Sequence, residues 1–342
     1  MRERLDTVAP AKAPPKRAAA SKGSAPQEVT FLPSGCTTLD CALGGGWAKK
    51  RVINVVGDKS TGKTLLVFEA AANFLLNEPG GRVQYDECES AFDPRYLANL
   101  GVPIDRINFA DRLNTVEDMF DSLNDSVKRK VPTLEIVDSL DALSDKAEMD
   151  REFGDPTYGT GKARDLSKLF RMLVRDMERS HLTLMIVSQI RSRINVTFGR
   201  QTTRAGGRAM DFYASQVVYL QQTGTINRTI NNVKRPVAYD IVAKVDKNKV
   251  GPPLREAAFT LEFGYGIDDL STCMAWLKEV GHLADVGCTI ANWKQWMRKV
   301  SSTDDKEYRA ELRKVQKAAR TRWAEIESGF LPKRRKYNGL LT

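Results

Sequence analysis

A glycine-rich segment in the first fifth of the chain has the residue types and spacing to bind phosphate groups. The run is Gly57-Asp-Lys-Ser-Thr-Gly-Lys-Thr64, which fits the pattern G-x-x-x-x-G-K-T. Its glycines let backbone N–H groups surround phosphate oxygens at the start of a helix. Lys63 is predicted to neutralise the β and γ phosphates, and the Thr64 hydroxyl to bind Mg²⁺. The expected nucleotide-binding residues of this loop are Gly57, Asp58, Lys59, Ser60, Thr61, Gly62, Lys63 and Thr64.

Asp138 is a second candidate for the same site. It follows the apolar run Leu134-Glu-Ile-Val and precedes Ser139. At a strand end beside the phosphate loop, its carboxylate is predicted to hold Mg²⁺ through a water molecule. An aspartate at a strand end is by itself also typical of a helix cap, and the nearby phosphate loop favours the metal role. We therefore expect ATP and Mg²⁺ as cofactors.

Hydrolysis of a bound nucleotide also needs a group that orients and deprotonates the attacking water. The apolar segment Val83–Tyr85 runs into three acidic residues, Asp86, Glu87 and Glu89. Each of these carboxylates lies close to the predicted strand end, and the residue types do not choose among them.

The elements that must position these residues alternate between short apolar segments and helical ones. The predicted strands are Val52–Val56, Val83–Tyr85, Leu134–Val137 and Leu182–Val187, followed by Val217–Leu220, Tyr239–Val245 and Ala258–Phe263. The predicted helices are Thr64–Leu76, Val116–Lys128 and Lys162–Arg179. This alternation is typical of an α/β fold with a largely parallel sheet flanked by helices.

Positive charge is concentrated at the two ends of the chain. The sequence has 53 Lys and Arg against 43 Asp and Glu, a net charge of +10. Residues 1–30 hold six basic and three acidic residues, and residues 287–342 hold fourteen and six. Cationic ends suit a polyanionic partner, although solvated tails that aid solubility explain them equally well. We divide the chain into a flexible basic arm (1–30), an ATPase core (31–270) and a small helical basic region (271–342).

The C-terminal region contains one amphipathic helix. Apolar residues recur there at steps of three or four, at Tyr308, Leu312, Val315, Ala319, Trp323 and Ile326. Basic residues occupy the rest of its surface, and Lys333–Lys336 form a further basic cluster. Packing of this helix on the body is the favoured interpretation, with contact to DNA as an addition.

Several classes of protein and site are disfavoured. The five cysteines show no paired short spacing, and there are two histidines, so we expect reduced thiols and no structural metal. No apolar run approaches the roughly 20 residues that span a bilayer. We expect a cytoplasmic protein with no membrane partner.

Several motifs, in the same order along residues 34–285, resemble the RecA family of ATP-dependent recombinases, which includes phage UvsX. In the run Glu89-Ser-Ala-Phe-Asp93-Pro-Arg-Tyr96, the resemblance implies that Glu89 is the catalytic base, that Asp93 contacts the adenine and that Tyr96 stacks on it. The phrase Val187-Ser-Gln189-Ile-Arg191 resembles the strand end at which Gln189 would sense the γ-phosphate. The fold implied is a RecA-like ATPase core.

The run Lys247-Asn-Lys249 resembles a family element whose two lysines reach the phosphates bound by the neighbouring subunit. Lys247 and Lys249 would then act in trans, with ATP held between protomers. From charge alone, a solvated turn is the simpler interpretation.

The stretch from Ile190 to Phe212 is rich in arginine and glycine and has no acidic residue before Asp211. Such a segment suits phosphates, and a mobile surface loop would explain its glycines without its arginines. In the family it is a DNA-binding loop, in which Ile194 would wedge between bases. A first loop at Asp150–Lys162 would precede further contacts on the following helix. The expected DNA-binding residues are Arg164, Ser167, Arg171, Arg191, Arg193, Ile194, Arg200, Arg204, Gly206, Gly207 and Arg208.

The resemblance implies a DNA-dependent ATPase that forms helical filaments on single-stranded DNA and exchanges strands with homologous double-stranded DNA. A single-strand-binding protein and a loader are further expected partners, in a bacterial or phage-infected cell, at the nucleoid. Two alternatives stay open: a hexameric helicase of related fold, and an ATP-gated DNA-binding mediator without catalysis.

Two departures from the family pattern concern the ends. Pro10, Pro14 and Pro15 break the N-terminal polymerisation helix, so filament contacts are expected at Glu28–Leu32 instead. The basic C-terminus replaces the acidic tail of bacterial relatives. These departures favour a phage-encoded or otherwise divergent member.

Overall fold

The structure, a computed structural model, describes residues 28–88, 97–98, 100–110, 113–149, 161–192, 202–204 and 206–334. Its strands are β1 (Phe31–Leu32), β2 (Trp47–Ala48), β3 (Val52–Gly57), β4 (Arg82–Glu87), β5 (Ile107–Ala110), β6 (Thr133–Asp138), β7 (Leu182–Ser192), β8 (Thr202–Arg204), β9 (Gln216–Ile230), β10 (Val233–Asn248), β11 (Glu256–Glu262) and β12 (Gly266–Ile267). Its helices are α1 (Thr37–Leu43), α2 (Lys63–Asn77), α4 (Val116–Lys128), α5 (Lys146–Met149), α6 (Gly161–Arg179), α7 (Gly207–Tyr213), α8 (Asp269–Glu279), α9 (Trp293–Ser301) and α10 (Asp305–Phe330). Three 3₁₀ turns complete the described part: η1 (Ile104–Arg106), η2 (Leu140–Ala142) and η3 (Leu283–Val286).

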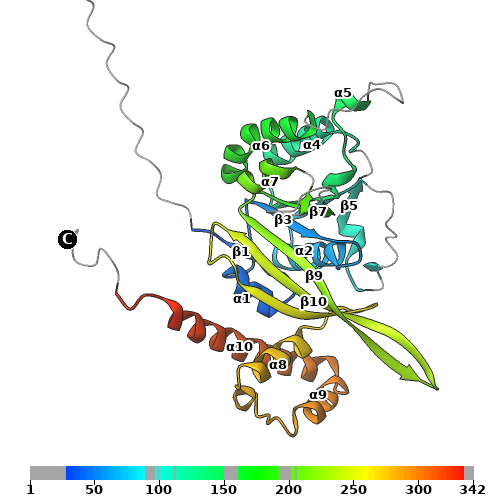
Figure 1. The fold of residues 1–342 in the computed structure, drawn as a ribbon, viewed down its shortest axis with the longest axis vertical. Coiled ribbons are helices and arrows are strands. Elements are labelled where there is room, and N and C mark those ends of the chain that lie inside the picture. Colours follow the sequence, from blue (N-terminus) through cyan, green and yellow to red (C-terminus); the bar gives the residue numbers. More distant parts are fainter. Residues whose placement is uncertain are drawn as a thin grey trace, which may run out of the picture.

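One large sheet organises the molecule (Figure 1). Its strand order among the described residues is β12-β11-β10-β9-β3-β7-β6-β4-β5, and β8 pairs with β7. The pairs from β5 to β9 along this order are parallel, and those from β9 to β12 are antiparallel. The predicted α/β fold with a largely parallel sheet flanked by helices is therefore confirmed.

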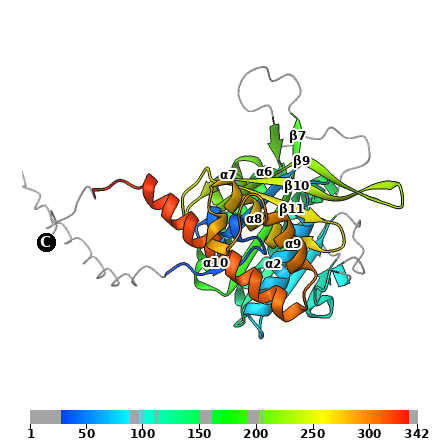
Figure 2. The same cartoon turned by 90° about the horizontal axis from the view of Figure 1, so that it is seen from below.

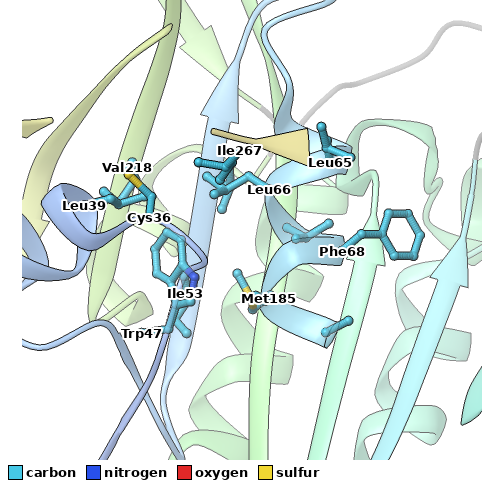
Figure 3. Packing of buried hydrophobic residues seen from close by; sticks show 14 of the residues in the cluster. Cys36, Leu39, Trp47, Ile53, Leu65, Leu66, Phe68, Met185, Val218 and Ile267 are labelled. Carbon is cyan, nitrogen blue, oxygen red and sulfur yellow. The ribbon is translucent and has the colours of Figure 1, made fainter. Parts of the chain in front are cut away.

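Both faces of β3 are buried, which explains its continuous apolar sequence. Because successive side chains of a strand point to opposite faces, Ile53 and Val55 join the core beneath α1 and α2, as Figure 3 illustrates for Ile53. Val52 and Val56 join a second core beneath α4, α6 and α7. The strand is thus clamped between two layers of helices. Its carboxyl end, where the glycine-rich loop begins, is positioned by both cores.

The β9–β10 hairpin is much longer than the predicted strands Val217–Leu220 and Tyr239–Val245. Its outer half projects from the sheet as a two-stranded ribbon (Figure 1), and residues 225–236 are exposed. With solvent on both faces, this half has no apolar alternation for the sequence to reveal. Asn231 and Asn232 close the turn with positive φ angles of 48° and 63°, as a tight hairpin turn requires.

The C-terminal elements form a third core, and α8 and α10 also contact α1 of the main body. Figure 2 shows these helices from below, in front of the main body. Val315 and Ala319 of α10 are buried in this core, and Trp323 stacks on Trp276 at 5.2 Å between ring centroids. The predicted packing of the amphipathic helix is therefore confirmed. A division at residue 270 stays a prediction, because α8 and α10 contact α1 as well as each other. No described helix is long and apolar enough to cross a membrane.

Asp269 joins three helices through its buried carboxylate. It accepts hydrogen bonds from the Thr37 amide at 2.7 Å, the Thr37 hydroxyl at 2.8 Å and Gln316 Nε2 at 2.8 Å. These contacts connect the start of α1 and the middle of α10 to the start of α8.

Replacement of Asp269 by alanine is expected to destabilise the protein by about 3 kcal/mol, because buried donors lose their acceptor. Denaturant unfolding measures this difference in free energy. The exposed Glu279→Ala on the same helix is the control and should differ from the parent by less than about 0.5 kcal/mol. Equal values for the two variants would show that the Asp269 contacts contribute nothing.

Candidate nucleotide and DNA site

The glycine-rich loop between β3 and α2 has the backbone conformation that phosphate binding needs. Gly62 has a φ of 81°, which favours glycine, and directly precedes the first residue of α2. Lys63 is buried, and its Nζ donates to the carbonyl oxygen of Asp58 at 2.6 Å, so the side chain folds back over the loop. Thr61 Oγ1 donates to the same carbonyl at 2.9 Å. Residues of the loop, among them Gly62, Lys63 and Thr64, line one pocket.

The two predicted magnesium ligands lie side by side. Thr64 Oγ1 donates to Asp138 Oδ2 at 2.8 Å, which joins the first turn of α2 to the end of β6. Tyr85 Oη donates to the same carboxylate oxygen at 2.9 Å. Burial, followed by the charge of Asp138, raises the pKa of the Tyr85 hydroxyl, so it stays a donor. A hydroxyl and a carboxylate oxygen are the ligand types that Mg²⁺ prefers.

Tyr85 was not among the predicted site residues. Its role in orienting Asp138 has one weak signal in the sequence, a polar aromatic side chain near the end of a strand. The side chain is nearly fully buried and stacks on Phe68 of α2, with ring centroids 4.5 Å apart. Burial of a tyrosine usually requires a hydrogen-bond partner, and here the partner is Asp138.

An aromatic wall adjoins the phosphate loop and was also missed. A pocket of about 350 Å³ runs from the loop to β10 and β11. Tyr239 and Phe263 meet there edge to face, with centroids 4.8 Å apart, next to Leu261. Nothing in the sequence relates these residues to the loop, because about 180 residues separate them. Asp93 and Tyr96, the residues expected to contact the base, lie outside the described residues.

The structure removes one of the three candidate bases. Asp86 is 1% exposed and accepts a hydrogen bond from Gln84 Nε2 at 2.8 Å, so it cannot hold the attacking water. Glu87 is half-buried at the end of β4, where its register partner is Asp138. Glu89 lies outside the described residues, so its assignment as the base stays a prediction.

Asp86 instead forms a buried acidic pair with Glu135 of the adjacent strand β6. Glu135 Oε1 accepts from the Ser122 hydroxyl at 2.9 Å. Burial first, and then the charge of Asp86, raises the pKa of Glu135 to about 7. Two neighbouring ionised carboxylates that are buried away from water are unfavourable. The pair therefore holds a proton near neutral pH.

Gln189 lies at the carboxyl end of β7, beside the phosphate loop. It is the register partner of Gly57, the first residue of that loop. Its position is therefore the one that a sensor of bound phosphate would need. β7 continues to Ser192, past the predicted end at Val187, because β8 pairs with its last three residues.

Lys247 and Lys249 lie toward the amino end of β3, whereas their own phosphate loop follows its carboxyl end. Lys247 pairs with Val217, which in turn pairs with Asn54 near the start of β3. Both ammonium groups donate to the carbonyl oxygen of Phe212, at 3.1 Å each, at the end of α7. The carbonyl end of a helix attracts cations.

The candidate DNA-binding residues that the structure describes fall into three groups. Arg164 and Arg171 are exposed, and Ser167 is half-buried, on one face of α6. Arg191 and Arg204 occupy the antiparallel β7–β8 ribbon, where Arg204 pairs with Ile190. The remaining predicted contacts are Gly206, which has a φ of 76°, and Gly207 and Arg208, which begin α7. Arg193, Ile194 and Arg200 lie outside the described residues.

Comparison with known proteins identifies a family. Residues 17–268 match the model of the RecA N-terminal domain. Protein RecA of Prochlorococcus marinus (strain MIT 9303) is 36% identical over 255 residues, which are 74% of this chain and 65% of that protein. Protein RecA of Fusobacterium nucleatum is 36% identical over 240 residues, 70% and 61% of the two chains. The match therefore spans less than two thirds of these relatives' length.

Replacement of Glu135 by glutamine is expected to change how stability depends on pH. The pKa of Glu135 is about 7 in the folded protein, above the ordinary 4.5, so the folded state binds the proton more tightly. The free energy of unfolding of the parent therefore falls relative to that of Glu135→Gln as the pH rises from about 4.5 to about 7. The total decrease is up to about 3 kcal/mol, and the difference stays constant above pH 7.

The free energy of unfolding of both proteins at pH 5 and pH 8 measures this effect. The exposed Glu279→Gln serves as the control, for which the difference from the parent should be the same at both pH values. A difference between the parent and Glu135→Gln that does not grow with pH would contradict the buried acidic pair.

Proposed function

Because the chain belongs to the RecA family, we propose that it is a DNA-dependent ATPase and homologous recombinase that assembles as an ATP-dependent helical filament on single-stranded DNA. Homologous double-stranded DNA is the second substrate, and strand exchange is the outcome. ATP with Mg²⁺ is the proposed cofactor, and recombination and repair of DNA are the proposed processes.

The observation that carries the proposal is the separation of two cationic groups. Lys63 lies in the phosphate loop at the carboxyl end of β3, whereas Lys247 and Lys249 lie near its amino end. Lys247 is level with Asn54, three residues or about 10 Å before Gly57 along the strand, and β10 lies two strands or about another 10 Å to the side. Both lysine ammonium groups are held at the Phe212 carbonyl oxygen, away from their own loop. A neighbouring copy that stacks this edge on the loop would complete the site. Such head-to-tail contacts generate rings or helical filaments.

Within the loop, this chain's own groups fit Mg²⁺–ATP. Lys63 would neutralise the terminal phosphates, and Thr64 and Asp138 would hold the metal, which supplies charge stabilisation when bound. Glu89 would orient and deprotonate the attacking water. Tyr239 and Phe263 would contact the nucleoside side of the pocket. Gln189, next to Gly57, would report the γ-phosphate to the segment that follows β7.

Most of the proposed DNA contacts are arginines, whose guanidinium groups suit backbone phosphates. The α6 face with Arg164 and Arg171 and the ribbon with Arg191 and Arg204 would bind backbone phosphates, with Ile194 between bases. Backbone contacts carry no sequence code, which suits a protein that must accept any sequence.

Two surface features support assembly of copies. Within the part of the chain that the structure describes, β5 ends the sheet order and no strand pairs with its outer side. A groove of about 270 Å³ between α4 and α6 has apolar side chains, including Phe120 and the 53% exposed Met172, and charged ones at Glu117, Asp121, Asp165 and Lys168. Within the expected contact segment Glu28–Leu32, Phe31 and Leu32 already pair with β2, so a role for this segment in the filament stays a prediction.

Electron microscopy with single-stranded DNA, Mg²⁺ and a non-hydrolysable ATP analogue tests the proposal, against a sample without nucleotide. Long helical filaments that depend on nucleotide are expected. Closed rings would indicate a helicase, and DNA-bound particles without an ordered polymer would indicate a mediator.

Two inactive variants should restore each other if the site is shared between copies. Lys63→Ala and the double variant Lys247→Ala/Lys249→Ala are each expected to lose DNA-stimulated ATP turnover by more than about 100-fold. In an equal mixture, about a quarter of the interfaces would join an intact loop to intact lysines, and turnover should recover to roughly that fraction.

Each variant alone at the total concentration is the control, and circular dichroism checks that both fold. Failure of the mixture to recover, with filaments still present, would show that the lysines do not act on a neighbour's nucleotide.

A further inference from the structure

The 3₁₀ turn η2 begins two residues after Asp138, with Ser139 between them, and contacts β7. The backbone N–H of Gln189 donates to Asp141 Oδ2 of this turn at 2.7 Å. A charged acceptor makes this hydrogen bond stronger than one between neutral groups. The Asp141 carboxylate thus connects the turn that follows Asp138, the proposed magnesium ligand, with Gln189, the residue proposed to sense phosphate.

The position of this contact explains why a side chain is needed. The pairing of β6 with β7 ends at Val137 and Ile186, whereas β7 continues to Ser192. A strand that outruns its neighbour must find other partners for its backbone amides. Asp141 takes the place of β6 on one side of Gln189, and Gly57 of the phosphate loop is its partner strand residue on the other.

The opposite side of η2 contacts two elements that adjoin the candidate DNA segments. Lys162 Nζ, in the first turn of α6, donates to the carbonyl oxygens of Asp141, at 3.3 Å, and of Leu143. Leu140 Cδ2 lies 3.0 Å from where a Cβ on Gly206 would be, so the turn packs closely on the start of α7. α6 follows residues 150–160, the predicted first DNA loop, and Gly206 follows residues 193–205, which include four of the proposed DNA contacts: Arg193, Ile194, Arg200 and Arg204.

We propose that Asp141 is a positioning residue that holds the end of β7 so that Gln189 transmits the nucleotide state to DNA binding. It acts through Gln189, while its turn contacts both elements that lead out of the DNA segments. The inference rests on the proposed role of Gln189. It adds a residue to which neither the phosphate-loop motif nor the strand-end motif points.

The test measures the affinity for single-stranded DNA with Mg²⁺ and a non-hydrolysable ATP analogue, and again without nucleotide. The ratio of the two affinities is the nucleotide-dependent gain. Asp141→Ala is expected to lower this gain about tenfold, as loss of one charge-assisted hydrogen bond implies, while KM for ATP changes by less than about twofold. Asp141→Asn keeps an oxygen acceptor and should restore most of the gain.

Two further variants distinguish positioning from general damage. Asp105→Ala replaces an exposed aspartate at the centre of another 3₁₀ turn, η1, and should keep the parent's gain. In a double-mutant cycle, adding Asp141→Ala to Gln189→Ala should lower the gain no further, because both act through one residue. If Asp141→Ala does not fold, Asp141→Ser, whose hydroxyl is too short to reach the amide, replaces it.

The outcomes separate this inference from the proposed function. A parent with no nucleotide-dependent gain would contradict the function itself. A parent with the gain, together with an Asp141→Ala variant that keeps it, would overturn the role of Asp141 alone. The role would also be overturned if Asp141→Asn were as defective as alanine, or if the double variant were weaker than Gln189→Ala.

Discussion

The hydrogen bonds that converge on the Asp138 carboxylate are the constraint on which the site depends. Thr64 reaches it from α2 and Tyr85 from β4, so three elements meet at one oxygen. This is possible because β3, β4 and β6 are parallel, which brings their carboxyl ends to the same edge of the sheet. The phosphate loop, the acidic residues after β4 and Gln189 on β7 all occupy that edge for the same reason.

The two sides of the parallel core carry different parts of one proposed site. The phosphate loop lies where β3 ends, and Lys247 and Lys249 lie near where it begins, held by carbonyl oxygens of α7. In a single copy of the chain, Lys247 and Lys249 therefore lie apart from the phosphate loop. The proposed site would combine the loop of one copy with the two lysines of another. The sheet keeps the two sides apart, which is why the proposed site requires a neighbouring copy.

Carboxylates that are buried or partly buried connect elements of the interior through hydrogen bonds, in addition to the apolar cores. Asp269 joins α1, α8 and α10, Glu135 lies beside Asp86 of the adjacent strand, and the partly buried Asp141 accepts from the amide of Gln189 on β7. Isolated charges are costly inside a protein, so each of these groups needs donors or a proton. In return, the hydrogen bonds of a carboxylate are directional, so they fix the geometry of the groups that it contacts. Apolar packing is not directional.

The sequence by itself determined the α/β fold, the main strands and helices, the phosphate loop and its pairing with Asp138. These rest on local signals, namely apolar runs, helical periodicity and a motif of eight consecutive residues. The exposed half of the β9–β10 hairpin was missed because it has no buried face to impose a pattern. Only the tertiary structure decided that Asp86 is buried, that Tyr85 donates to Asp138, that Tyr239 and Phe263 line the pocket beside the glycine-rich loop and that Asp141 accepts from Gln189. Each of these depends on which strands become neighbours, and strand order is set by packing between segments far apart in the chain, which no local spacing encodes.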